Sequence, residues 1–243
     1  MTDLKHEIET GTGHFDLELW RRLIAEAIGT AFLLIAVVGS GIMASRLSPS
    51  DEGLQLLENA AATAGALVGL ILMMGAVSGA HFNPAVTLLD RLFGYITSRD
   101  AGFYIVAQIF GACVGTMIAN LMFELPVVSL STTPRSSVSL WLSEGVATIG
   151  LLLLIHGCVR NGRANMVPFA VGSWIAGAYW FTSSTSFANP AATIGRTLSN
   201  TFAGIEPSSV PIFIVIQTIS VSLAYGLIRV LYPLSPSEVE TRP

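Results

Sequence analysis

Two stretches of the sequence decide the fold: Ser78-Gly79-Ala80-His81-Phe82-Asn83-Pro84-Ala85-Val86-Thr87 and Ser186-Phe187-Ala188-Asn189-Pro190-Ala191-Ala192-Thr193. Each is too apolar for a solvated loop and too short to span a bilayer. Asn followed by Pro indicates a helix start, because Asn is a favoured N-cap and Pro fits the first helical position. Each stretch therefore predicts extended chain that leads into a half-length helix, beginning at Pro84 and at Pro190.

Long apolar runs surround these two stretches. The chain is 52% hydrophobic and only 12% charged, whereas about a quarter of the residues are charged in soluble domains. Leu23–Ala44 contains a single charge, Glu26, and its 22 residues cover about 33 Å as a helix, enough for a bilayer core. The runs do not alternate as barrel strands do. They predict an all-α membrane protein with six transmembrane helices, at Leu23–Ala44, Ala60–Val77, Gly102–Phe123, Leu142–Val159, Val167–Phe181 and Val210–Leu231.

The chain is also an internal repeat. Asn83-Pro84-Ala85 corresponds to Asn189-Pro190-Ala191, and the first and fourth runs carry Glu26 and Glu144 while the third and sixth carry Gln108 and Gln217. Each half has three spans, an odd number, so the second half is inverted relative to the first. The predicted parts are an N-terminal tail (1–21), a first repeat (22–125, half-helix 78–92), a linker (126–139), a second repeat (140–232, half-helix 186–199) and a C-terminal tail (233–243).

Composition excludes several classes of function. The net charge is −4, which argues against nucleic acid as a partner. Neither of the two cysteines, Cys113 and Cys158, belongs to a metal-ligand cluster, and no catalytic arrangement of side chains is evident. We therefore expect no enzyme, no metal and no cofactor. His156, alone on its helix, is expected to be a packed or interfacial histidine.

The basic residues predict the orientation in the membrane. With six spans, nine of the 12 Lys and Arg residues fall on the side of the termini and three on the other side. Basic residues favour the cytoplasm, so both termini are expected there. The nine are Lys5, Arg21, Arg22, Arg91, Arg99, Arg160, Arg163, Arg229 and Arg242; the three are Arg46, Arg135 and Arg196.

The inversion places the two half-helices head to head near the middle of the membrane. Asn83 and Asn189 would meet there, and each amide could donate a hydrogen bond to a passing oxygen. The positive ends of both half-helices also point at that place, which opposes cations and protons. A neutral polar molecule can exchange hydrogen bonds with the amides, so the pattern predicts a pore for small neutral solutes.

These motifs resemble the aquaporin (major intrinsic protein) family, and the resemblance covers about Arg22 to Tyr232. The resemblance implies an hourglass pore in each subunit, a homotetramer in the lipid bilayer, and passive flux of water or small neutral solutes without a cofactor. It implies a pore constriction formed by the two Asn-Pro-Ala motifs: Asn83, Pro84, Ala85, Asn189, Pro190 and Ala191.

The sequence departs from the family at the selectivity filter. Aquaporins usually carry Arg directly after the second Asn-Pro-Ala, and this chain has Ala192 there. The other filter positions fall on Thr63 and Ser186, and on helix five on either Tyr179 or Gly177, with Tyr179 preferred. Such a filter offers hydroxyl groups in place of a guanidinium. It would admit glycerol, urea or neutral metalloid hydroxides such as arsenous acid.

One branch of the family looks similar in this region. Bacterial aquaporins associated with arsenic resistance have a small residue after the second Asn-Pro-Ala and a stretch resembling 193–204. The resemblance implies a multi-pass protein of a bacterial inner membrane.

The remaining polar residues have two interpretations each. Glu26 and Glu144 hold the adjacent loops through backbone N–H groups, or they relay protons; their symmetry favours the former. Gln108 and Gln217 hydrogen-bond between helices or line the pore. His81 lines the cytoplasmic mouth or holds its loop.

Arg196 also has two interpretations. It lies one turn after Ala192 and on the same face, so its guanidinium could hang over the outer vestibule as a displaced filter charge. Alternatively it caps the half-helix or pairs with Glu206.

Two other classes of function also suit the pattern. Inverted repeats with broken helices also occur in coupled secondary transporters, and a closed pore would leave a membrane scaffold.

Overall fold

The computed structural model describes residues 12–233, with side chains from Leu19 onward, and these residues form helices and no strand. The α-helices are α1 (Thr12–Leu47), α2 (Glu52–Ser78), α3 (Pro84–Phe93), α4 (Ser98–Met122), α5 (Val138–Arg160), α6 (Val167–Phe181), α7 (Pro190–Gly195) and α8 (Val210–Leu231). Short 3-10 turns are η1 (Ala164–Met166), η2 (Arg196–Leu198) and η3 (Pro207–Ser209).

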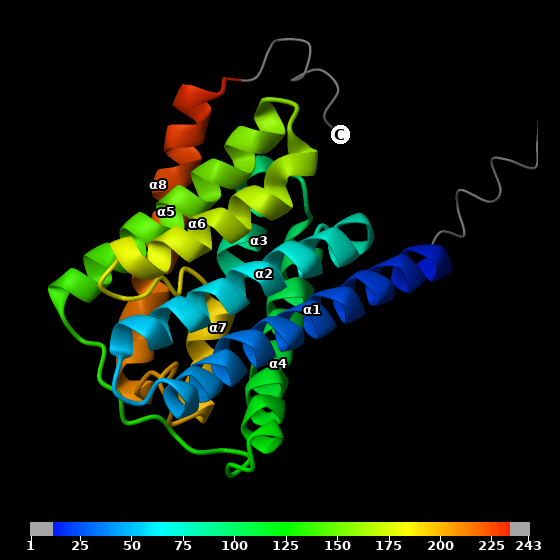
Figure 1. The fold of residues 1–243 in the computed structure, drawn as a ribbon. Coiled ribbons are helices and arrows are strands. Elements are labelled where there is room, and N and C mark those ends of the chain that lie inside the picture. The colour runs from blue at the N-terminus through cyan, green and yellow to red at the C-terminus, as the bar shows by residue number, and fades with distance from the viewer. Residues whose placement is uncertain (1–11, 234–243) are drawn as a thin grey trace, which may run out of the picture.

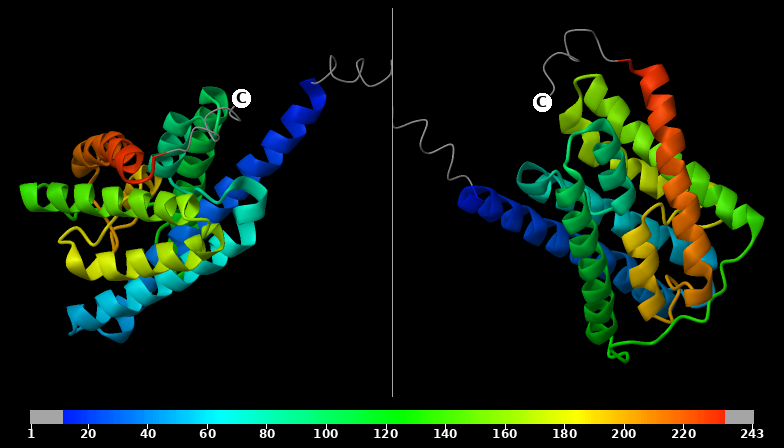
Figure 2. Two further views of the ribbon diagram at one scale, coloured as in Figure 1. Left: turned by 90° about the horizontal axis from the view of Figure 1, so that it is seen from above. Right: turned by 180° about the vertical axis from the view of Figure 1, so that it is seen from behind.

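The two halves of the chain pack in the same way. In the first half α1 lies against α2 and α4, and in the second α5 lies against α6 and α8. The contact of α2 with α6 joins the halves along one side (Figure 1). On the other side the short helices α3 and α7 each contact both α4 and α8, and Figure 2 shows α7 between these two from behind. The fold is the predicted inverted repeat with two half-helices enclosed by long ones.

Within residues 12–233, five helices are long and apolar enough to cross a membrane: Leu19–Leu47 of α1, then α2, α4, α5, and Pro207–Leu231 with α8. The sixth expected span, α6, has 15 residues and covers about 22 Å. The turn η1 directly precedes it and extends it at that end. The longer α2 and α5 lie beside it.

Helix α1 begins at Thr12, inside the range expected as an N-terminal tail. Its early part is held by packing, because Leu19 is buried in a cluster with Ile96, Ala101 and Tyr104. Hydrophobic patterning located the apolar part of this helix, but a helix can continue past the apolar run where a neighbouring helix covers it.

Helices α1 and α4 approach each other closely at two glycines. A Cβ on Gly111 would overlap the carbonyl oxygen of Ala27, and one on Gly115 would overlap that of Ala31. Small residues that let backbones approach are typical of helix contacts in membranes. This contact holds α1 and α4 together, and α3 packs against α4.

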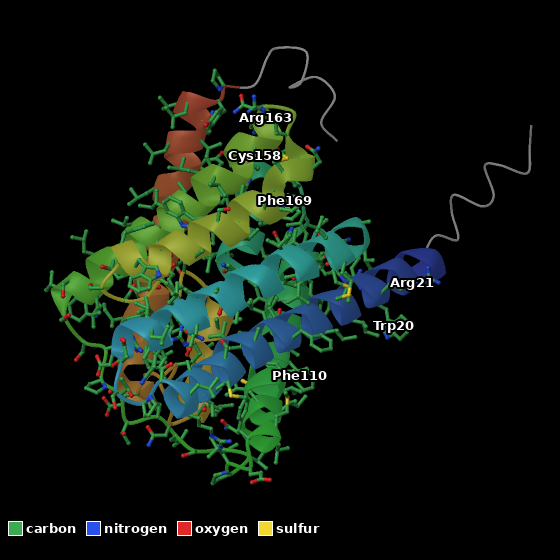
Figure 3. All side chains as sticks on the ribbon, in the orientation of Figure 1. Trp20, Arg21, Phe110, Cys158, Arg163 and Phe169 are labelled. Carbon is green, nitrogen blue, oxygen red and sulfur yellow. The ribbon has the colours of Figure 1, made fainter. Side chains whose placement is uncertain are left out.

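The outer faces of the long helices are apolar. Trp20 is 59% exposed and Phe110 is 64% exposed, and both project from the bundle in Figure 3. Phe169 on α6 is likewise exposed. An apolar perimeter of this kind faces lipid or neighbouring subunits, whereas the polar groups described next lie inside.

Candidate functional site

The loop before each half-helix is anchored by a buried glutamate. Glu26 on α1 is fully buried, and its two carboxylate oxygens accept hydrogen bonds from His81 N at 2.9 Å and Phe82 N at 2.7 Å. Its Oε1 also accepts from Ser78 Oγ. Carboxylates can satisfy several donors at once, so one residue fixes the turn that precedes α3.

The second half repeats this anchor. Glu144 on α5 is fully buried and accepts from Phe187 N and Ala188 N, both at 2.8 Å. Gln217 Nε2 donates to Glu144 Oε2 at 2.8 Å and to Thr193 Oγ1 at 3.1 Å. In the first half Gln108 Nε2 donates to Glu26 and to Thr87 Oγ1. Thr87 and Thr193, which were not predicted as part of the site, occupy equivalent positions four residues after each Asn.

The backbone of the two loops shares an unusual conformation. Ala80 and Phe82 have φ of +50° and +49°, and the corresponding Ser186 and Ala188 have φ of +52° and +46°. Positive φ costs a non-glycine residue roughly 1 kcal/mol. The anchoring bonds to the glutamates offset this cost, and the conformation presents the carbonyl groups of Phe82 and Ala188 to the opposite loop.

Those carbonyl groups receive the two asparagine amides. Asn83 caps α3 by accepting from Ala85 N, and its Nδ2 donates to Ala188 O at 2.7 Å. Asn189 caps α7 by accepting from Ala191 N, and its Nδ2 donates to Phe82 O at 2.9 Å. Each amide therefore reaches across to the other half. An amide nitrogen carries two N–H groups, and one remains available on each.

A cavity of about 560 Å³ passes both asparagines. Residues from both halves line it, and the polar ones include Thr63, His81, Asn83, Asp90, His156, Asn165, Tyr179, Ser186, Asn189 and Arg196. Its lining is otherwise mostly apolar. Pro84, Ala85, Pro190 and Ala191 of the two motifs are buried beside the two asparagines.

Thr63, Tyr179, Ser186 and Ala192 also line this cavity. Tyr179 OH donates to Thr63 Oγ1 at 3.3 Å, and Ser186 Oγ is a buried hydroxyl without a partner in residues 12–233. Gly177, the alternative to Tyr179, is not among the lining residues. The four residues predicted from sequence for the filter thus all line the cavity, and two of them, Thr63 and Tyr179, are in contact there.

Arg196 forms part of the same wall. It is 3% exposed, its Nε donates to Ala203 O, and its Cζ lies 3.4 Å from the centroid of the Phe187 ring. It lines this cavity and also a second cavity of about 350 Å³. Within the described residues it forms no ion pair with Glu206.

The other end of the cavity holds an acidic residue between two histidines. His81 Nε2 lies 3.1 Å from Asp90 Oδ2, and His156 Nε2 lies 3.2 Å from Asp90 Oδ1. His81 therefore both lines the cavity and is tied to α3, where its Nδ1 lies 3.0 Å from Thr87 Oγ1. His156 is buried and packs on the Phe93 ring, as expected of a packed histidine, and it also pairs with Asp90 beside the cavity.

Sequence reasoning missed Asp90. It lies seven residues after Asn83, two helical turns along the same face, which is a signal that the sequence contains. In residues 12–233 no group of three or more His, Cys, Asp or Glu side chains is arranged to hold a metal ion. Asp90 and the two histidines thus form a hydrogen-bonded cluster.

An inverted repeat of membrane helices with two capped half-helices and a cavity between them defines a membrane transport protein. The Major intrinsic protein family matches residues 14–186, and the chain belongs to this family. It is accordingly an integral, multi-pass membrane protein and a passive channel for water and small neutral solutes. The family consists of channels, not enzymes.

Known proteins similar to this chain come from bacteria and plants. The chain is 46% identical over 229 residues to aquaglyceroporin AqpS of Rhizobium meliloti (strain 1021), covering 94% of this chain and 97% of that protein. It is 31% identical over 218 residues to a probable NIP-type aquaporin of Nicotiana alata, covering 86% and 78%. Among solved structures, the aquaglyceroporin from Plasmodium falciparum matches with a TM-score of 0.67 at 21% identity, covering 89% of this chain and all of that one. This last likeness concerns the fold.

Proposed function

We propose that the channel passes small neutral hydroxylated solutes down their gradient: polyols, urea or metalloid hydroxides such as arsenous acid. The observation that carries the proposal is the section of the cavity lined by Thr63, Tyr179, Ser186 and Ala192. With a methyl group at 192 in place of the family's guanidinium, the wall there offers space and hydroxyl groups. The 46% identical relative is named an aquaglyceroporin, which agrees with a solute larger than water.

The pore constriction is proposed at Asn83 and Asn189. Each asparagine amide donates one N–H to a carbonyl group of the opposite loop. This bond orients the second N–H of the same amide toward a solute oxygen. A neutral hydroxylated molecule can exchange its hydrogen bonds with water for hydrogen bonds with these amides, whereas a cation meets the positive ends of α3 and α7. Glu26, Glu144, Gln108 and Gln217 then serve as supports that hold this geometry.

Osmotic swelling of liposomes that contain the purified protein tests the proposal. The panel comprises water, glycerol, urea and arsenous acid, with empty liposomes as the baseline. We expect flux of at least one of the three larger solutes well above the baseline. Conduction of water alone would contradict the proposed solute class. No flux of any solute from folded protein would favour a closed-pore scaffold.

We further propose that both termini face the cytoplasm of a bacterial inner membrane. Nine of the 12 basic residues lie on the side of the termini, and basic residues mark the cytoplasmic side. A single cysteine introduced at Ser208 should react with an impermeant reagent added outside cells, and one introduced at Asn161 should not. The native Cys113 and Cys158 are first replaced by alanine. The reverse pattern would invert the assigned orientation.

A homotetramer is the proposed assembly. The resemblance to the family implies it, and the apolar perimeter formed by exposed residues such as Phe110 and Val106 can serve subunit contacts as well as lipid. Native mass spectrometry in detergent should give the mass of four chains of 25.7 kDa each. A stable monomer with full flux would contradict this proposal.

A further inference from the structure

A second cavity lies next to the filter section and holds two arginines. Its volume is about 350 Å³, and its lining is Glu52, Gly53, Leu56, Arg135, Thr185, Arg196 and Phe202. Arg196 also lines the main cavity, so the second cavity lies at one mouth of the pore. Arg135 comes from the linker between the two halves, on the side assigned to the cell exterior.

The two guanidinium groups share one aromatic ring. The Cζ of Arg135 lies 5.0 Å and that of Arg196 lies 3.4 Å from the centroid of Phe187. Arg135 Nε donates to Gly204 O at 3.0 Å, and Arg196 Nε donates to Ala203 O. The bonds to two adjacent carbonyl groups hold both side chains in place before any ligand arrives.

Several N–H groups of the pair remain available. Arg135 Nη1 makes one long bond of 3.4 Å to Ser184 O, and no partner in residues 12–233 is found for the two Nη atoms of Arg196 or for Nη2 of Arg135. Arg196 is 3% exposed, so water outside the protein does not solvate it fully. A guanidinium has five N–H donors and no acceptor, so the remaining N–H groups can donate to an acceptor in the cavity.

The positive charge is also uncompensated. Neither arginine forms an ion pair with a carboxylate of the described residues. The acid whose charge acts on both is Glu144, but the amides of Phe187 and Ala188 already occupy its oxygens. Glu52 also lines this cavity, and it is exposed to solvent. Burial lowers the pKa of Arg135 from its ordinary value, yet a guanidinium stays charged at neutral pH.

We propose that Arg135 and Arg196 form a binding site for a small oxyanion, such as a phosphate or a carboxylate, at the outer mouth of the pore. The planar fork of arginine matches two oxygens of such an anion, and charge-assisted bonds of this kind are short and strong. The cavity has room for about ten water molecules, so a small oxyanion enters with part of its hydration shell. This site goes beyond the passage of neutral solutes and does not depend on which of them crosses.

Equilibrium binding of radiolabelled inorganic phosphate to the detergent-purified protein tests the site. We expect saturable binding, displaced by unlabelled phosphate and by formate, and displaced poorly by chloride at the same ionic strength. Binding that chloride displaces equally well would overturn the assignment to oxyanions. Absence of saturable binding would overturn the site itself. Because no transport is measured, these outcomes are separate from those of the solute-flux assay.

Variants locate the binding. Arg135→Gln and Arg196→Gln should each raise the dissociation constant by about tenfold or more, since each removes a charged hydrogen-bond partner. Arg46→Gln is the matched control: Arg46 also donates to a carbonyl, Phe123 O, and lies over a phenyl ring, but it lines neither cavity. Affinity unchanged in both test variants would overturn the proposal, as would equal weakening in Arg46→Gln.

Folding of the variants is followed by thermal unfolding and by size-exclusion chromatography. If Arg135→Gln does not fold, Arg135→Lys provides the test, because Lys keeps the charge but loses the planar fork. We then expect weaker binding of phosphate and of formate in Arg135→Lys. Wild-type affinity in a folded Arg135→Lys protein would contradict a role for the guanidinium.

Discussion

Residue 192 holds the side chain whose size most directly sets the width of the proposed filter. Ala192→Arg would place a guanidinium in the cavity that Ala192 now lines together with Thr63 and Tyr179. We expect glycerol flux to fall at least about tenfold relative to water, which corresponds to a barrier higher by about 1.4 kcal/mol. Stopped-flow light scattering of liposomes at equal protein content measures both fluxes.

Ser208→Arg is the control for this change, because it adds the same charge at an exposed residue that lines neither cavity. It should leave the ratio of glycerol to water unchanged. An unchanged ratio in Ala192→Arg as well would show that position 192 does not limit the passage of solutes.

Arg196 supplies fixed positive charge to the cavity wall one turn beyond Ala192. Its burial and its contact with Phe187 hold the guanidinium at the wall, where we expect it to repel cations in a medium of low dielectric constant. Arg196→Ala should raise the sodium conductance of planar bilayers or change the ratio of solute fluxes, while Arg196→Lys retains the charge and stays close to wild type. Wild-type values in both variants would rule out a selectivity role for this side chain.

At the scale of the elements, the half-helices depend on the loops that Glu26 and Glu144 hold. In Glu144→Gln the amide group presents an N–H₂ to Phe187 N or Ala188 N, which are themselves donors. A lost hydrogen bond to a charged group costs about 1.5–3 kcal/mol. We therefore expect the midpoint of thermal unfolding to fall by about 5 °C, together with reduced flux.

The exposed Glu124, just after α4, offers the comparison, and Glu124→Gln should leave the unfolding midpoint within about 1 °C of wild type. If Glu144→Gln is as stable and as active as Glu124→Gln, the carboxylate does not hold the loop.

The contact between α1 and α4 makes a second prediction at this scale. Gly115→Ala would force a methyl group against the carbonyl of Ala31, and overpacking against backbone costs about 1–3 kcal/mol. Gly102→Ala in the same helix meets nothing within 4 Å, and it should be neutral or stabilising by about 0.5–1 kcal/mol. Thermal unfolding compares the two. Equal midpoints would contradict the close approach of the two helices.

Sequence alone predicted the elements whose signals are local. The starts of α3 and α7 follow from Asn-Pro, since both the cap and the first-turn proline act within a few residues. The network of Asp90 with His81 and His156 was not predicted, because it requires the register of α5 against α3. The early start of α1 was missed for a similar reason, since packing of Leu19 on Tyr104 extends the helix beyond its apolar run.

The filter shows the same division. Ala192 and Ser186 lie close to the second Asn-Pro-Ala, so counting along the chain reached them. On helix five, counting forward from Pro168 gives Tyr179 as the filter position, whereas counting back from Asn189 gives Gly177. Only the three-dimensional arrangement places Tyr179 on the cavity wall. The contact of Arg196 with Phe187 likewise depends on how the chain after α7 folds back to Ala203.

At the scale of the whole molecule, the acidic groups decide whether solute movement could be coupled to protons. A coupled carrier needs a group that binds a proton and faces the solute path. Glu26 and Glu144 are fully buried and occupied by loop amides. Asp90 does line the cavity, but each of its oxygens is engaged by a histidine.

The final concentration of glycerol inside liposomes should therefore equal the concentration outside, with or without a pH gradient across the membrane. A proton ionophore should leave this plateau unchanged, and Asp90→Asn should change at most the rate at which it is reached. The measurement is the plateau of radiolabelled glycerol uptake under an imposed pH gradient. A plateau above the external concentration that the ionophore abolishes would make the protein a proton-coupled transporter. In that case, loss of the excess in Asp90→Asn would identify Asp90 as the coupling group, since the two glutamates are closed off from the cavity.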